Sequence, residues 1–153
     1  MEICLMTQGH RFWEETISLA ERCSWKAGPF LAEKMKRNDF TSQERVCAVY
    51  ADGKVVGFCT FAEKDELPDE NAFTPFISFV FVDEQYRGKR LSERMIRTVI
   101  QYAGELGYKK IYVMSGEIGL YEKYGFTKLG DYKTIFGSVD QLFAKSIECI
   151  FRR

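Results

Sequence analysis

The stretch from Val80 to Ser92 constrains the fold of this chain more than any other segment. Its apolar start predicts the end of a buried strand, Gly88 predicts a tight turn, and a helical pattern begins at Leu91. A helix N-terminus carries unpaired backbone N–H groups and a partial positive charge, and glycine lets a ligand approach the backbone closely. The stretch therefore predicts a strand–turn–helix unit suited to a phosphate or pyrophosphate, although a basic glycine turn alone is more often only a turn.

The pattern around this unit predicts a mixed α/β fold. By residue number, the expected elements are two helices within 11–38, strands at 46–50, 55–61 and 76–82, a helix at 91–106, a strand at 110–114, a short helix at 119–124, and strands near 126–129 and 144–151. Asp52-Gly53 is typical of a hairpin turn, and Pro29 suits a first helical turn. The run from Phe76 to Val82 is apolar at almost every position, which predicts a central strand buried on both faces. This order indicates an α/β or α+β sheet with one parallel βαβ crossover.

The composition narrows the class of protein. A length of 153 residues with 46% hydrophobic and 15% aromatic residues predicts a single packed domain over 1–153. Basic and acidic residues both number 22, so the zero net charge gives no broad field for nucleic acid or an anionic membrane. The five cysteines include no CxxC pair and are an odd number, which favours reduced, mostly buried thiols in a cytoplasmic protein. The N-terminal residues predict neither a signal peptide nor a membrane span.

Two blocks, Val82–Met95 and Leu120–Phe126, occur in an order that matches a known family. Together they resemble the GNAT superfamily of acyl-CoA-dependent N-acyltransferases, in which a coenzyme A pyrophosphate loop precedes a Leu-Tyr-Glu-Lys-x-Gly-Phe block. The resemblance extends from about Val46 to Leu129. It implies a mixed, mostly antiparallel central sheet with flanking helices.

The resemblance also implies roles for the matching residues. Backbone groups of the strand would hold the pantetheine arm of acetyl-CoA, and the backbone from Gly88 to Glu93 would bind its pyrophosphate. The full set of implied coenzyme-binding residues is Val80, Phe81, Val82, Arg87, Gly88, Lys89, Arg90, Leu91, Ser92 and Glu93. Tyr121 falls where many members place the general acid that protonates the departing thiolate. The alternative for Tyr121 is an aromatic ring packed under the turn before Gly125.

Two departures from the family pattern matter. Arg90 and Ser92 stand where the family usually has glycine or alanine. We expect the Arg90 N–H to point at phosphate if the φ angle of this residue is negative. The stretch from Ser115 to Gly119 is short, so contacts to the acceptor from this loop are not predicted.

The general base remains open at this point. The central strand offers Phe76 and Ser78 where similar proteins often carry Glu or His. Glu63, Asp65 and Glu66 could remove a proton through water, could attract a cationic amine, or could form only a solvated acidic loop. His10 is the only histidine and is expected at the surface, which disfavours both a Ser-His-Asp or Cys-His set and a metal site.

We therefore expect an N-acetyltransferase that moves an acetyl group from acetyl-CoA directly to a primary amine of a small molecule or peptide. It would use no metal and no covalent intermediate, since no cysteine falls in the matching blocks. An acyl-CoA-binding regulatory module without turnover is the alternative. A nucleic-acid-binding protein, suggested by the basic residues 87–90, is disfavoured by the zero net charge. Members of the family frequently dimerise, so a homodimer is also left open.

Overall fold

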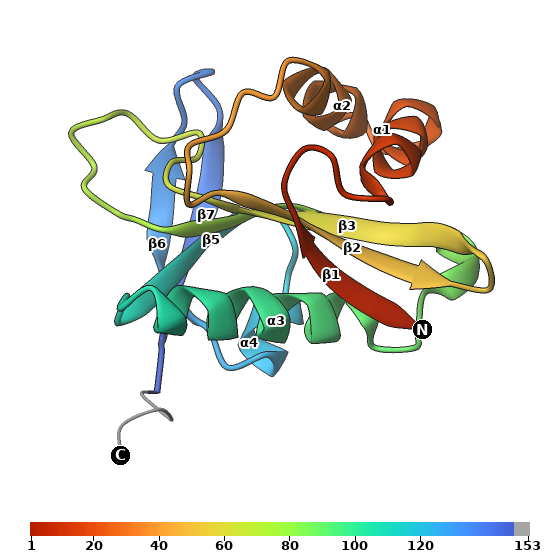
Figure 1. The fold of residues 1–153 in the computed structure, drawn as a ribbon. Helices are drawn as coiled ribbons and strands as arrows, with labels where there is room; N and C mark the ends of the chain where they lie inside the picture. The colour runs from red at the N-terminus through yellow and green to blue at the C-terminus, as the bar shows by residue number, and fades with distance from the viewer. Residues whose placement is uncertain (149–153) are drawn as a thin grey trace. The chain divides into compact units, whose positions relative to one another are not determined.

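The computed structural model describes residues 1–148, and its ribbon is drawn in Figure 1. The chain divides into two compact units, which are described separately. The first contains residues 1–61 and 79–99, and the second contains residues 62–78 and those from 100 onward. The strand β4 (Phe76–Val82) and the helix α3 (Leu91–Glu105) contribute to both units, as does the strand β3 (Lys54–Ala62) through its last residue.

The first unit pairs four strands in the order β1-β2-β3-β4. Its other elements are β1 (Glu2–Met6), α1 (Trp13–Arg22), α2 (Gly28–Lys36), β2 (Arg45–Ala51), β3 (Lys54–Ala62) and the single 3-10 turn η1 (Glu84–Tyr86). Within this unit α1 and α2 cover one face of β1, β2 and β3, while the first part of α3 lies on the other face (Figure 1). Gly28 allows the two N-terminal helices to meet, because a Cβ atom there would overlap the carbonyl oxygen of Ala20.

Apolar residues from both N-terminal helices and from all four strands fill the core of the first unit. Its fully buried members include Leu31, Met35 and Phe58, whose exposed fraction is 0%. Trp25, in the connection between α1 and α2, is half-buried and stacks on Phe81 with the ring centroids 6.1 Å apart. Burying aromatic and aliphatic side chains in this way is the main favourable contribution to folding.

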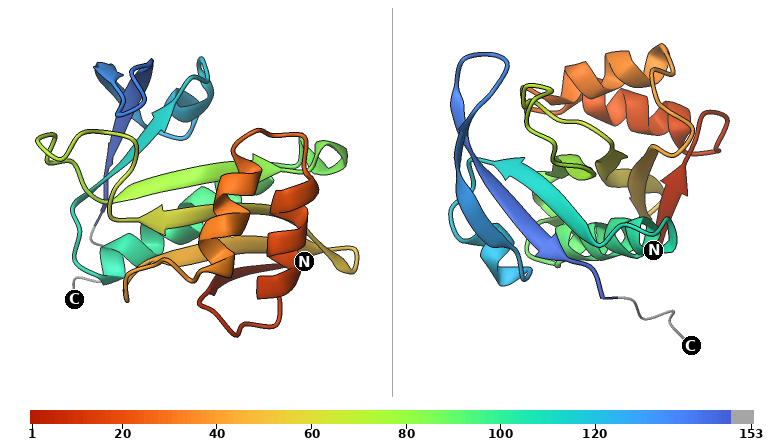
Figure 2. Two further views of the ribbon diagram at one scale, coloured as in Figure 1. Left: turned by 90° about the horizontal axis from the view of Figure 1, so that it is seen from above. Right: turned by 90° about the vertical axis from the view of Figure 1, so that its left-hand side faces the viewer.

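The second unit pairs its strands in the order β4-β5-β7-β6. Its further elements are β5 (Lys110–Ser115), α4 (Leu120–Lys123), β6 (Thr127–Lys133) and β7 (Val139–Ser146). β4 and β5 are parallel, with Phe76 opposite Tyr112, whereas β7 is antiparallel to both of its neighbours. Figure 2 shows β5 beside the β6–β7 hairpin in its right-hand view. A small core of Leu67, Phe76 and Leu142 lies within this unit.

The predicted fold class is confirmed, because the strands are mixed, mostly antiparallel and flanked by helices, and α3 connects the parallel pair β4 and β5. The hairpin turn is also confirmed, since Asp52 and Gly53 both have positive φ angles. In the part of the chain from residue 1 to 148, no helix has the length and apolar character needed to cross a membrane.

Four expectations need correction. β1 was not predicted, because five residues at an edge give little periodic signal. β4 is buried only in part, with Ser78, Phe79 and Val80 half-exposed. β7 begins at Val139 rather than near residue 144, and residues 149–151 of that expected strand lie outside the described residues. Of the described cysteines, two are buried and two are only half-buried.

Candidate active site

The second half of β4 has an unusual backbone. Phe79 has a φ angle of 54°, which is strained for a bulky residue and costs of order 1–3 kcal/mol. Directly after β4, the N–H of Asp83 donates to the carbonyl of Val56 on β3 at 2.8 Å. Phe81 is buried, whereas Val80 and Val82 are half-exposed. The predicted pantetheine strand therefore contains a distorted and partly exposed segment, as a strand that receives an extended ligand requires.

The predicted pyrophosphate loop follows directly and leads into α3. The N–H of Arg94 donates to the carbonyl of Arg90, so the helix begins there, and the N–H groups of residues 91–93 precede its first intrahelical donor. Gly88 has a φ angle of 81°, and a Cβ atom there would meet nothing within 4 Å. The positive φ angle is thus the reason for a glycine at position 88, since no neighbouring atom would contact a side chain there.

Arg90 corrects one expectation. Its φ angle is 62°, not negative, so a non-glycine residue occupies the left-handed conformation that glycine favours. Its guanidinium lies 3.8 Å from the carboxylate of Glu93, which also receives a 3.1 Å contact from Arg97. The one acidic side chain in the first turn of α3 is thereby flanked by two cations.

Arg87 is held against the end of β4. Its Nε donates to the carbonyl of Val82 at 2.9 Å, and its guanidinium lies 5.7 Å from the ring centroid of Phe81. The side chain, predicted to add charge to the loop, is therefore oriented by the strand that precedes the loop.

Tyr86 connects the loop to the β2–β3 hairpin, a contact that the sequence did not reveal. Its hydroxyl donates to Asp52 at 2.9 Å, and this hydrogen bond raises the pKa of Tyr86. The ammonium groups of Lys54 and Lys89 lie 5.5 and 5.1 Å from its ring centroid. Tyr86 and Asp52 are 34 positions apart in the chain, so the periodicity of the local sequence could not predict their contact.

Tyr121 lies on α4 in the second unit. Its side chain is 4% exposed, and its ring contacts those of Tyr124, Phe126 and Phe143 with centroids 6.1, 5.7 and 5.6 Å away. Its carbonyl accepts from the N–H of Phe126 at 3.0 Å. These contacts fix the ring orientation, which both a proton donor and a packing residue require.

The acidic loop that follows β3 also belongs to the second unit. The hydroxyl of Ser78 on β4 donates to Asp65 at 2.5 Å. Burial raises the pKa of Asp65, hydrogen bonds from Ser78 and from the Glu66 N–H oppose the rise, and the charge of Asp140 adds to it. Burial together with the charges of Asp65 and Asp140 also raises the pKa of Glu66. The carboxylates of Asp65 and Glu66 are therefore partly desolvated and lie near other negative charge, and both conditions disfavour their charged forms.

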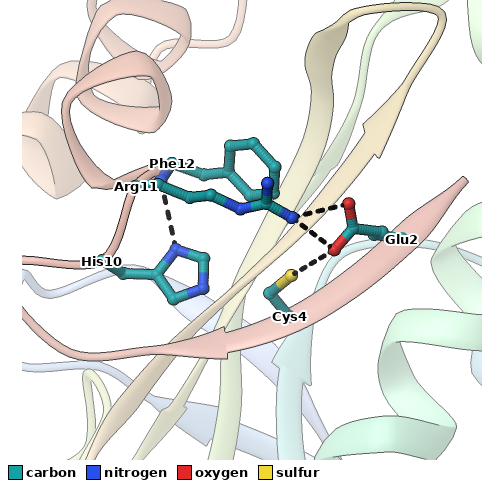
Figure 3. Close-up of polar contacts among 5 residues, drawn as sticks. All are labelled: Glu2, Cys4, His10, Arg11 and Phe12. Carbon is teal, nitrogen blue, oxygen red and sulfur yellow. Dashed lines mark hydrogen bonds and ion pairs between the residues drawn. The ribbon is translucent and has the colours of Figure 1, made fainter.

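His10 takes a local structural role near the N-terminus (Figure 3). Its Nδ1 accepts from the N–H of Phe12 at 3.1 Å, and the side chain is half-buried rather than at the surface. Arg11 nearby forms 2.8 Å contacts with both carboxylate oxygens of Glu2, to which the Cys4 thiol donates. Within residues 1–148, no group of three or more His, Cys, Asp or Glu side chains is placed to hold a metal ion.

Comparison with known proteins agrees with this arrangement. The profile of the "Acetyltransferase (GNAT) family" matches residues 10–126. The spermine/spermidine N(1)-acetyltransferase of Bacillus subtilis (strain 168) is 32% identical over 90 residues, which cover 54% of this chain and 59% of that protein. The chain thus spans about three fifths of the length of this curated relative.

Solved structures share the fold at low sequence identity. The aminoglycoside 6'-acetyltransferase type Ii superposes with a TM-score of 0.75 at 18% identity, covering 97% of this chain and 98% of that one. A GNAT family N-acetyltransferase (YhbS) from Escherichia coli in complex with CoA gives a TM-score of 0.69 at 16% identity, covering 96% and 81%.

Proposed function

Because the chain belongs to the acetyltransferase (GNAT) family, we propose that it transfers an acetyl group from acetyl-CoA directly to a primary amine of a small molecule or peptide. The observation that carries the proposal is the junction of β4 and α3. There a distorted, partly exposed strand runs into a loop with left-handed residues at Gly88 and Arg90, followed by a helix N-terminus. Backbone N–H groups with this setting are suited to bind a diphosphate.

In this proposal, main-chain groups of Val80, Phe81 and Val82 hold the pantetheine arm, and residues 87–93 bind the pyrophosphate. Holding the thioester next to an amine supplies much of the acceleration through proximity. Tyr121 donates a proton to the departing thiolate. Residues 1–153 act as one acyltransferase domain, and coenzyme binding requires no metal.

A cationic acceptor is favoured by the charge of the second unit. The charge of Asp140 raises the pKa of both Asp65 and Glu66, so negative charge is concentrated around these two side chains. Such charge attracts ammonium groups. The Bacillus subtilis relative carries the name of a polyamine acetyltransferase, and the similar solved structures include aminoglycoside acetyltransferases. We propose a small polyamine-like cation as the acceptor class.

Thiol release tests the proposal. Purified protein is mixed with acetyl-CoA and a panel of spermidine, an aminoglycoside, a free amino acid and a lysine peptide, and coenzyme A formation is followed with a thiol reagent. We expect turnover to be highest with the polycations. Saturable acetyl-CoA binding without turnover on any amine would instead identify the regulatory module, and absence of binding would refute both.

Gly88→Val tests the loop itself. A β-branched residue at a φ angle of 81° is strained and would distort the loop proposed to bind the pyrophosphate, so we expect at least about tenfold weaker acetyl-CoA binding by calorimetry. Gly137→Val is the matched control, because Gly137 also has a positive φ angle of 86° and open space around it, but lies in the β6–β7 turn. Equal affinities of the two variants would contradict the assignment of the loop.

A further inference from the structure

The acidic loop contains one carboxylate that is fixed by its neighbours. Asp65 receives the hydroxyl of Ser78 on one oxygen at 2.5 Å and the N–H of Glu66 on the other at 2.6 Å. Each carboxylate oxygen of Asp65 thus accepts one hydrogen bond, one from the loop itself and one from Ser78 on β4. We propose that Asp65, acting through Ser78, is the group that accepts the proton of the attacking amine; this inference rests on the proposed acetyltransferase function.

The loop around Asp65 is anchored at several points, which a merely solvated acidic loop would not be. The hydroxyl of Thr74 donates to the carbonyl of Glu63 at 2.7 Å and closes the loop at its base. The N–H of Ile135 donates to the carbonyl of Glu66 at 2.7 Å, and Leu67 is buried in the small core of this unit. A base held in this way loses little orientational freedom when it reacts.

The position of Ser78 in the chain gives this pair a reason to act on the acceptor. Ser78 immediately precedes the strained residue Phe79, and it is the first residue of the partly exposed segment of β4. That segment is the one proposed to hold the acyl-bearing arm of the coenzyme. Ser78 is two positions before Val80, the first of the strand residues proposed to hold that arm.

The surroundings of Asp65 raise its pKa above the ordinary value of an aspartate. Burial and, to a lesser extent, the charge of Asp140 on β7 disfavour its charged form and raise its pKa, while the hydrogen bonds from Ser78 and from the Glu66 N–H oppose the rise. A carboxylate that is destabilised by like charges holds a proton more strongly, which makes it a better base for an ammonium.

The proton balance of the step is complete. One proton of the substrate ammonium passes to the Ser78 oxygen as the Ser78 hydroxyl proton passes to Asp65, and the neutral amine nitrogen then bonds to the thioester carbonyl carbon. The carbon–sulfur bond breaks, and the sulfur takes a proton from Tyr121. Asp65 and the nitrogen each release one proton to solvent, Tyr121 regains one, and the products are the N-acetylated amine and coenzyme A.

Asp65→Asn tests the inference, because asparagine keeps an acceptor for the Glu66 N–H and can hydrogen-bond to the Ser78 oxygen through its amide group, while the base is removed. With acetyl-CoA and spermidine, or a faster amine from the panel above, we expect kcat at about pH 7 to fall ~100-fold, with acetyl-CoA affinity unchanged within about twofold. The loss should shrink as pH rises toward about 9.5, since more of the amine is then neutral without help. Ser78→Ala should show the same pH trend with a smaller loss.

Glu70→Gln is the matched control, as it removes an exposed carboxylate of the same loop and should leave kcat unchanged. A loss in Asp65→Asn that is equal at every pH, or an unchanged kcat, would overturn the role of Asp65 while leaving the acetyltransferase function intact. Absence of turnover in the unmodified protein would refute the function itself, and with it this inference.

Discussion

At the scale of single residues, the loop between β4 and α3 depends on backbone conformations that side chains disfavour. Gly88 meets its left-handed conformation without cost, but Arg90 does not. An L-residue in this region costs roughly 1–2 kcal/mol, and the Arg90 side chain is 84% exposed, so packing does not offset the cost. Arg90 therefore stores strain next to the predicted phosphate contacts.

Arg90→Gly should stabilise the protein. Relief of the left-handed strain is opposed by the greater freedom of glycine in the unfolded chain, which leaves a net gain of about 0.5–1 kcal/mol. Urea unfolding should show a higher midpoint with an unchanged slope. Lys89→Gly, at a neighbouring position without a positive φ angle, is the control and should lower the midpoint. A lower midpoint for Arg90→Gly would contradict the strain argument.

Tyr121→Phe separates chemistry from packing at the second predicted site. The ring contacts with Phe126 and Phe143 persist in the variant, so we expect stability and acetyl-CoA affinity to remain close to those of the parent. Loss of the proton donor should lower turnover by about 10–100-fold. Tyr124→Phe, at the C-cap of the same short helix, is the control. Unchanged turnover in Tyr121→Phe would leave this residue with a packing role alone.

At the scale of elements, the sequence predicted what local patterns encode. The apolar run of β4, the amphipathic stripe of α3 with buried Met95 and Val99, and the hairpin turn at Asp52 were all predicted and are confirmed. The elements that were not predicted, or were predicted with wrong bounds, show little periodic pattern in the sequence. β1 is an edge strand, and the turn before β7 lacks a strong dipeptide signal because Gly137 follows two exposed apolar residues, Ile135 and Phe136.

The candidate site follows the same division. The loop residues were predicted because glycine and basic residues mark a local turn. The Asp65–Ser78 contact spans 13 positions and the Tyr86–Asp52 contact spans 34, so neither has a local signal. The left-handed conformation of Arg90 was missed for a different reason. Its side chain is one that normally avoids this region, so propensity predicted the opposite sign of φ.

The Tyr86–Asp52 contact gives a prediction for the β2–β3 hairpin as an element. Tyr86→Phe removes the hydrogen bond but keeps the ring on which Lys54 and Lys89 lie. The turn would then no longer hold η1 in place before the loop, so we expect acetyl-CoA affinity to fall about 2–5-fold, the effect of one modest hydrogen bond. Asp52→Asn retains an acceptor for the Tyr86 hydroxyl, so its acetyl-CoA affinity should fall less. Affinities equal to the parent in both variants would show that the hairpin does not position the loop.

At the scale of the whole molecule, the question is whether the two compact units fold as one. β4 and α3 each run through both units, so neither unit can lose these elements without affecting the other. Both tryptophans, Trp13 and Trp25, lie in the first unit, whereas the β6–β7 hairpin lies in the second. Tryptophan fluorescence therefore reports the first unit alone, and far-ultraviolet circular dichroism reports both.

If residues 1–153 form one cooperative domain, urea transitions followed by the two probes should coincide in midpoint and slope, as all-or-none unfolding requires. Acetyl-CoA should shift both transitions together to higher urea, because a ligand that binds only the folded state stabilises everything that unfolds with its site. Leu142→Ala, which creates a cavity in the core of the second unit, should lower the fluorescence midpoint of the first by the same amount as the dichroism midpoint. A fluorescence transition that stays in place while the dichroism transition moves would divide the chain into two independently folding domains.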